Sequence, residues 1–178
     1  MQRFTEIEQN RILITLWEDN LNGLIIGDSS GNIVKVNDAL CQILQYTAAE
    51  LEGLHFREIT HKDDVNKDWD MAQRVLDDTY GLQKYTIKKR YQTKLDTIIW
   101  VSLTVNRIED TRGNFLYFLG QVTPLNQQKA ADYLLEQKID RYKYSKKSFW
   151  KTIKEWGGYI ALALGSLGVI LREYFGDK

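Results

Sequence analysis

The spacing of apolar residues changes several times along the chain, and each change marks a different predicted element. In residues 1–19, Phe4, Ile7, Ile14 and Trp17 recur at roughly helical intervals among charged and amide side chains. This spacing predicts an amphipathic helix at the N-terminus.

A hairpin and a group of helices are predicted next. The apolar run 24–26 and the residues Ile33, Val34 and Val36 flank a polar turn in which Gly31 can adopt a positive φ, the signature of a β-hairpin. Asn37 or Asp38 can then cap a helix over residues 39–44. A short helical turn over residues 48–51 follows. Asp63 or Asp64 can cap a longer helix that ends near residue 80.

Three strand-like runs close this region, at residues 83–91, 97–105 and 115–122. Tyr85, Ile87 and Lys89 alternate with polar neighbours, as on a half-buried strand. The order of two strands, several helices and three strands predicts an α+β fold. We expect a five-stranded antiparallel sheet with short helices on one side, flanked by the N-terminal amphipathic helix and a long C-terminal helix.

The rest of the chain predicts a basic linker helix over residues 124–155 and a transmembrane helix over residues 156–175. Residues 156–171 carry no charge, aromatic residues flank them, and lysines and arginines crowd the N-terminal side. We therefore expect a single C-terminal span with the preceding domain facing the cytoplasm. A helix lying on the membrane and a soluble or oligomer-packed helix are the alternatives.

A stripe of small residues within the uncharged run could let membrane helices approach closely. The stripe consists of Gly157, Ala161, Gly165 and Gly168. Glycine and alanine are also common in membrane helices generally, so this packing role stays one of two interpretations.

Composition narrows the function classes only slightly. The 178 residues have a formal charge of zero, which gives no argument for nucleic-acid binding. The single cysteine, Cys41, excludes an internal disulfide and fits a reducing compartment.

An ordered series of motifs over residues 20–123 resembles the PAS family, of the PAS-plus-PAC or S-box type. The motifs resemble the family's "N-x-A", "E-L-x-G", "I-T-H-P-E-D" and "I-x-W-V" blocks, with Gln45 where glycine is usual and Leu95-Asp96 where Asp-Gly is usual. The motif positions taken as structural are Asn37, Glu50, Gly53, His61, Asp64 and Trp100.

The resemblance implies a PAS fold with a pocket between the sheet and the short helices. By fold position, the expected lining is Ile26, Val36, Ile43, Phe56, Trp69, Met71, Leu103 and Phe118. A core filled entirely by such side chains is the competing interpretation.

No cofactor is identified by the resemblance, and its nature stays unknown. The block that holds the reactive cysteine in flavin photosensors starts at His55 here and contains no cysteine, and residues 64–78 offer no histidine to a haem. Cys41 is expected in the core, with a redox or ligand role as the alternative. We expect surface or capping roles for His55 and His61, with pocket contact or metal binding as alternatives. No metal site is predicted.

The sequence indicates a sensor rather than an enzyme. It shows no nucleophile elbow, phosphate loop or paired-carboxylate motif, so no catalytic residue is predicted. We expect a membrane-anchored sensor or interaction module that binds a small ligand or partner, forms a homodimer through residues 1–19 and the sheet, and acts through a separate output protein. The alternatives are a ligand-free scaffold and a phage-type membrane-active component for lysis or pore formation.

Overall fold

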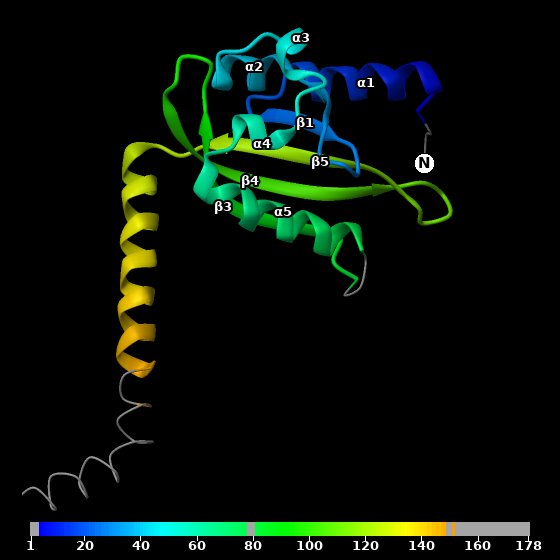
Figure 1. Cartoon of the computed structure of the whole chain (residues 1–178). Helices are drawn as coiled ribbons and strands as arrows, with labels where there is room; N and C mark the ends of the chain where they lie inside the picture. The colour runs from blue at the N-terminus through cyan, green and yellow to red at the C-terminus, as the bar shows by residue number, and fades with distance from the viewer. Residues whose placement is uncertain (1–3, 78–80, 149–150, 152–178) are drawn as a thin grey trace, which may run out of the picture. The chain divides into compact units, whose positions relative to one another are not determined.

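The computed structural model describes residues 4–77, 81–148 and 151, and within them it contains a five-stranded antiparallel sheet (Figure 1). The predicted fold class is confirmed. The strand order is β2-β1-β5-β4-β3. The strands are β1 (Gly23–Gly27), β2 (Ile33–Val36), β3 (Lys84–Gln92), β4 (Ile98–Glu109) and β5 (Phe115–Pro124).

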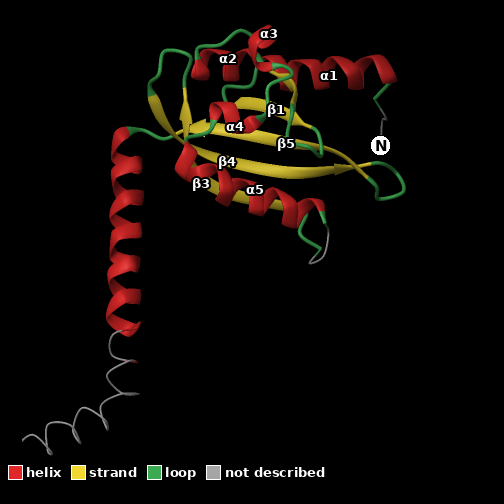
Figure 2. Cartoon of the chain, viewed as in Figure 1, coloured by secondary structure: helices red, strands yellow, loops and turns green. Residues whose placement is uncertain are grey.

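The helices that precede and interrupt the strands are visible in Figure 2. They are α1 (Glu6–Glu18), α2 (Asp38–Leu44), α3 (Ala48–Leu51), α4 (Phe56–Ile59) and α5 (Lys62–Leu76). The chain divides into two compact units, residues 1–127 and 128–178. The first unit contains all ten of these elements.

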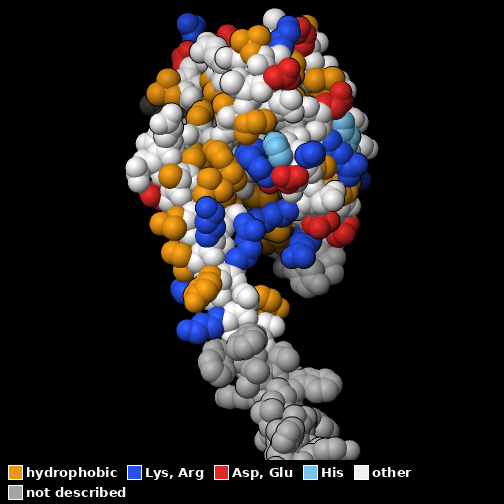
Figure 3. Space-filling view, turned by 60° about the vertical axis from the view of Figure 1, so that its left-hand side comes forward, with side chains coloured by type: hydrophobic (Ala, Val, Ile, Leu, Met, Phe, Trp, Pro, Cys, Tyr) orange, Lys and Arg blue, Asp and Glu red, His pale blue; other side chains and the backbone are white. Residues whose placement is uncertain are grey.

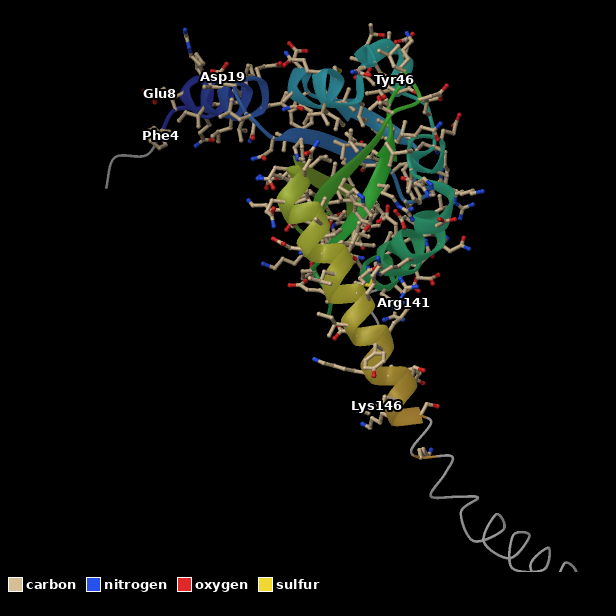
Figure 4. All side chains as sticks on the ribbon, turned by 90° about the vertical axis from the view of Figure 1, so that its left-hand side faces the viewer. Phe4, Glu8, Asp19, Tyr46, Arg141 and Lys146 are labelled. Carbon is tan, nitrogen blue, oxygen red and sulfur yellow. The ribbon has the colours of Figure 1, made fainter. Side chains whose placement is uncertain are left out.

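Helix α1 begins with a reciprocal cap and buries none of its residues. The Thr5 hydroxyl accepts from the Glu8 amide, and the Glu8 carboxylate accepts from the Thr5 amide. Phe4 and Glu8 lie at the N-terminal end of α1 and Asp19 at its other end (Figure 4). Ile7 is 81% exposed and Leu13 62% exposed, which leaves apolar side chains of α1 in water.

The core lies between one face of the sheet and helices α2–α5. Strand β3 shows why: its residues alternate, and Tyr85, Ile87, Lys89 and Tyr91 all face inward. Three of these four side chains are ordinary core residues. Lys89, which is only 1% exposed, is a buried cation.

The cap of α5 differs from its sequence prediction. His61 precedes the helix and its ring nitrogen Nδ1 accepts from the Asp63 amide at 3.3 Å, whereas Asp63 and Asp64 lie within the first turn. Asn37, the first of the two candidates, caps α2. Asp64 is therefore free to contact β3, as described below.

Two turns use a left-handed residue other than glycine. Gln45 ends α2 with φ 63°, and Asp96 forms the β3–β4 turn with φ 58°. The family's usual glycine is thus replaced at both turns without loss of the turn, because a single residue tolerates this conformation at modest cost.

Residues 127–148 of the chain form a helix. Its side chains are mostly exposed, and Leu135, Ile139 and Tyr142 follow one another at intervals of four and three residues. Arg141 and Lys146 project from this helix (Figure 4).

The predicted membrane localisation is corrected by the structure. Among residues 4–77, 81–148 and 151, no helix is long and apolar enough to cross a membrane, because the long helix over residues 127–148 carries many charged side chains. This finding contradicts the predicted C-terminal span. The proposed span at 156–175, with its stripe Gly157, Ala161, Gly165 and Gly168, lies outside the described residues.

Candidate functional site

A cavity of about 70 Å³ lies between the sheet and helices α4 and α5. Its wall is mostly apolar, with aromatic rings from both helices and from the sheet. The lining residues are Ile25, Gly27, Gly31, Phe56, Asp68, Trp69, Ala72, Tyr85, Tyr91, Leu103, Val105, Phe118 and Gly120.

The helical wall of the cavity is a pair of stacked rings. Phe56 of α4 and Trp69 of α5 have centroids 5.8 Å apart and planes inclined by 19°. Arg57 is exposed, and its guanidinium lies 5.2 Å from the centroid of the Trp69 ring. Trp69 is half-buried, so this wall also reaches the protein surface.

Glycines keep the sheet side of the cavity open. A Cβ atom on Gly120 would lie 2.6 Å from Cγ2 of Ile25, and one on Gly31 would lie 2.9 Å from Cδ1 of Phe56. Any larger residue at these positions would have to displace Ile25 or Phe56, both of which line the cavity.

A buried polar cluster of Thr60, Asp68, Tyr85 and Lys89 forms one end of the site. Lys89 Nζ donates to Asp68 Oδ2 at 2.5 Å and to Thr60 Oγ1 at 3.0 Å. The Tyr85 hydroxyl donates to Asp68 Oδ1 at 2.9 Å. Asp68 and Tyr85 line the cavity. Lys89 is not among its lining residues, and its Nζ lies 4.2 Å from the ring centroid of Tyr91, which is.

Burial and pairing determine the protonation of this polar cluster. Burial alone would lower the pKa of Lys89, but the oxygens of Tyr91 and Asp68 raise it above its ordinary value. Burial, together with the negative charge of Asp68, raises the pKa of Tyr85 far above its usual range. At neutral pH the cluster therefore contains a lysine ammonium and a neutral phenol.

A second ion pair fixes the helix that carries Asp68 and Trp69. The Asp64 carboxylate accepts from Arg90 at Nε, at Nη2 and at the backbone amide, over 2.8–2.9 Å. Burial opposes ionisation of Asp64, but these hydrogen bonds hold its pKa below its ordinary value. The start of α5 is thereby attached to β3.

The pocket residues expected from the sequence fall into two groups. Phe56, Trp69, Leu103 and Phe118 line the cavity. The other four lie outside its wall: Ile26 alternates with the lining residue Ile25, and Val36, Ile43 and Met71 belong to or pack against the surrounding core.

The sequence interpretation missed the polar cluster. One signal was present, because the alternation in β3 placed Lys89 on the same face as Tyr85 and Ile87. A second was the position of Asp68, four residues before the inward-facing Ala72 on α5. Neither signal identifies which lysine and which aspartate meet.

Asn37 joins the N-terminal helix to the sheet. Its Oδ1 accepts from the amides of Leu24 and Leu40, and its Nδ2 donates to the carbonyls of Trp17 and Asn22. Asn22 Oδ1 in turn accepts from the Thr123 hydroxyl at 2.8 Å. The end of α1 and the end of β5 thus meet at one hydrogen-bonded network.

The remaining motif residues have local structural roles. Glu50 caps α3 through Thr47 and pairs with Lys94, whose hydrogen bond is the main cause that lowers the pKa of Glu50 to about 2. Gly53 adopts φ 93°. Trp100 lies under the Arg90 guanidinium, 5.3 Å from the ring centroid.

The cysteine and histidines show no arrangement for catalysis. Burial and the charge of Asp38 raise the pKa of Cys41, which disfavours the reactive thiolate. His55 caps α4, and its Nε2 lies 2.9 Å from the Ser30 carbonyl oxygen. Figure 3 shows histidine side chains at the surface among acidic and basic ones. In the described part of the chain, no three His, Cys, Asp or Glu side chains gather as a metal site.

The fold and the cavity between sheet and helices define the class of this protein. The family model of the PAS domain matches residues 21–123, more than half of the chain. The chain therefore belongs to the PAS domain family. This match does not distinguish the S-box type, which remains a prediction.

A curated protein that matches part of this chain is a probable cyclase. The chain is 29% identical over 134 residues to the probable diguanylate cyclase DgcE of Escherichia coli (strain K12), covering 75% of this chain but only 12% of that protein. The chain thus spans a small part of its relative's length.

Solved PAS structures share its fold. The PAS domain of a Colwellia psychrerythraea protein aligns with a TM-score of 0.60 and 14% identity, over 66% of this chain and 97% of that one. A domain of a sensory box sensor histidine kinase/response regulator from Geobacter sulfurreducens aligns with a TM-score of 0.54 and 21% identity. The alignment covers 66% of this chain and 96% of that one. The Rhodobacter sphaeroides LOV protein aligns with a TM-score of 0.57 and 15% identity, over 69% of this chain and 70% of that one.

Proposed function

We propose that this PAS protein senses a small molecule in the cavity beside Asp68 and transmits its binding through β5 to the helix that follows. The observation that carries the proposal is the continuity of β5. Phe118 and Gly120 line the cavity, and the same strand runs to Thr123 and Pro124 and then into residues 127–148. A ligand that prefers one cavity shape would shift the population of β5 conformations.

The Asn37 network supports transmission at this point. Thr123 is hydrogen-bonded to Asn22, whose carbonyl also accepts from Asn37. A displacement of β5 would therefore change the position of the end of α1 as well as the start of the helix that follows β5.

The cavity is suited to a small metabolite rather than a large cofactor. A single buried water needs roughly 10–15 Å³. A cavity of about 70 Å³ therefore suits a compact ligand of a few non-hydrogen atoms. Haem and flavin are several times larger and would require the core to open.

We further propose that the chain has no catalytic activity of its own and acts through a partner. The relative DgcE is a probable cyclase of which this chain matches a small part. A module of this kind would pass its signal to a separate output protein. A ligand-free scaffold is the second candidate, favoured by the exposed apolar side chains of α1, which suit pairing with another copy.

A ligand screen with a cavity-filling variant tests the sensor proposal. Ala72→Leu would extend a lining side chain into the cavity, and Ala49→Leu on the exposed surface of α3 is the matched control. A ligand present at about 100 times its Kd stabilises the folded state by roughly 2.7 kcal/mol, which raises Tm by several degrees.

We expect at least one compound of a metabolite library to raise the Tm of the wild type and of Ala49→Leu but not of Ala72→Leu. Hydrogen exchange should then slow in β5 and change in residues 127–148. A library without a single cavity-dependent hit, together with native mass spectra free of co-purified molecules, would favour the scaffold instead.

A further inference from the structure

The polar cluster at the cavity end specifies what kind of molecule the cavity takes. Resting on the proposed sensor function, we propose that the ligand is a small uncharged molecule with an apolar body and a single hydroxyl or N–H donor. A compact alcohol or phenol has these properties. The inference follows from three features of the cluster.

The first feature is charge balance. Asp68 and Lys89 are 3% and 1% exposed, and each neutralises the other at 2.5 Å. An anionic or cationic ligand would add a charge without a counterion in a buried site, at a large desolvation cost. The site therefore selects against carboxylates, phosphates and amines in their charged forms.

The second feature is the direction of the hydrogen bonds. The Tyr85 hydroxyl donates to Asp68, the Thr60 hydroxyl donates to the Phe56 carbonyl, and Lys89 donates to Asp68 and Thr60. These donors are engaged within the protein. Asp68 and Tyr85 both line the cavity, and their oxygens retain acceptor capacity, so these two residues can complement a ligand that donates.

The third feature is the rest of the wall. Phe56, Trp69 and Phe118 present rings, and Leu103 and Val105 present aliphatic side chains. Apart from Asp68, the two tyrosine hydroxyls and the indole N–H of Trp69, the side chains on this wall are apolar. The apolar body of the ligand would be buried here by the hydrophobic effect.

A buried ion pair contributes little net stability compared with apolar residues of similar volume. The Lys89–Asp68 pair is therefore hard to explain by folding alone. Recognition of a hydrogen-bond donor gives the pair a role, because the hydrogen bond from Lys89 holds the Asp68 side chain in place at the cavity wall.

Four probes of matched size test this inference: butan-1-ol, diethyl ether, propanoate and butylammonium. Binding to the full chain is followed by amide chemical shifts in two-dimensional NMR. We expect shifts at cavity residues with butan-1-ol, about tenfold weaker binding of diethyl ether, which lacks a donor, and no saturable binding of the two ions.

Two variants localise the effect. Ala72→Leu should abolish binding of butan-1-ol, whereas Ala49→Leu should leave it unchanged. Tyr85→Phe removes one acceptor oxygen while keeping the ring, so it should weaken butan-1-ol several-fold and leave diethyl ether unaffected. The retained ether binding also shows that Tyr85→Phe is folded.

The outcomes separate this inference from the sensor proposal. Equal binding of ether and alcohol, or cavity-dependent binding of propanoate or butylammonium, would overturn the donor requirement or the neutrality and leave the sensor proposal standing. If no probe binds but the library screen yields a cavity-dependent hit, the ligand class is wrong. If neither yields a hit, both proposals fail.

Discussion

Asp64 fixes the start of α5 against β3 through three hydrogen bonds from Arg90. Because its folded-state pKa is lowered, the ionised carboxylate stabilises the fold above the ordinary aspartate pKa of about 3.9. This stabilisation is lost as the pH falls through the lower folded-state pKa.

We predict that Asp64→Asn lowers the free energy of unfolding by about 1 kcal/mol or more at pH 7. The difference from the wild type should begin to narrow below about pH 4, because the unfolded wild-type chain then binds a proton at Asp64 that the folded chain does not. Urea unfolding at pH 7, 5 and 3.5, chosen to span about 3.9, measures both effects.

Asp63→Asn is the matched control. Its side chain is 59% exposed, and its contacts to Arg90 and His61 are long, at 3.4 and 3.6 Å, so little change in the free energy of unfolding is expected. An Asp64→Asn deficit that is the same at pH 7 and pH 3.5 would show that lost packing, rather than charge, is the cause.

Single residues of the site were only partly predictable from the sequence. Phe56, Trp69, Leu103 and Phe118 could be placed on the cavity from the order of the motifs. Asp68 and Lys89 could not be paired, because they are 21 positions apart on different elements. The register between α5 and β3 decides that pairing, and this register is a tertiary property.

The approach of β1 to α2 depends on a glycine at the start of the strand. A Cβ atom on Gly23 would lie 2.7 Å from Cδ1 of Leu40 and 3.1 Å from its Cα. The second contact involves backbone, so rotation of the Leu40 side chain could not relieve it.

We predict that Gly23→Ala lowers the free energy of unfolding by about 1–3 kcal/mol, because β1 and α2 must separate. Gly27→Ala at the other end of the same strand is the control, since its Cβ would meet only Asn32 O at an ordinary 3.5 Å. Chemical denaturation of both variants gives the comparison, and an equal loss for the two would point to strand propensity instead of packing.

The elements were predictable in kind and order, whereas some of their ends were not. The predicted helix to about residue 80 ends at Leu76, where Arg107 Nη1 donates to the carbonyls of Val75 and Leu76. This C-terminal cap comes from β4, 31 and 32 positions away. No local signal in the helix reveals it.

The whole molecule has apolar side chains on α1 that no described residue of the chain covers. Ile7 is 81% exposed and Ile14 is 62% exposed. The two residues are seven positions apart, so they lie on the same face of the helix. A second copy of the chain would bury them, and the 4-3 spacing of Leu135, Ile139 and Tyr142 in the other unit suits a paired helix as well.

We predict that the full chain is a homodimer and that the double variant Ile7→Glu/Ile14→Glu shifts it to monomer at micromolar concentration. Charges introduced at these two positions would be costly in an apolar interface. Light scattering coupled to size-exclusion chromatography measures the mass. The control is Gln9→Glu, an exposed change on the same helix. A wild-type chain that elutes as a monomer would contradict the pairing.

Strand β5 is the last strand of the sheet in sequence, yet it lies at the centre between β1 and β4. Its register pairs Val122 with Gly23, so residues near the two ends of the domain in sequence lie side by side. Synthesis proceeds at roughly 5–20 residues per second, so the β1–β2 hairpin is made several seconds before β5. During that time the edge of β1 that pairs with β5 has no partner strand. The cavity gains Phe118 and Gly120 only when β5 has been made. A ligand can therefore assist folding of this chain only after translation has passed β5, and until then one edge of β1 stays unpaired.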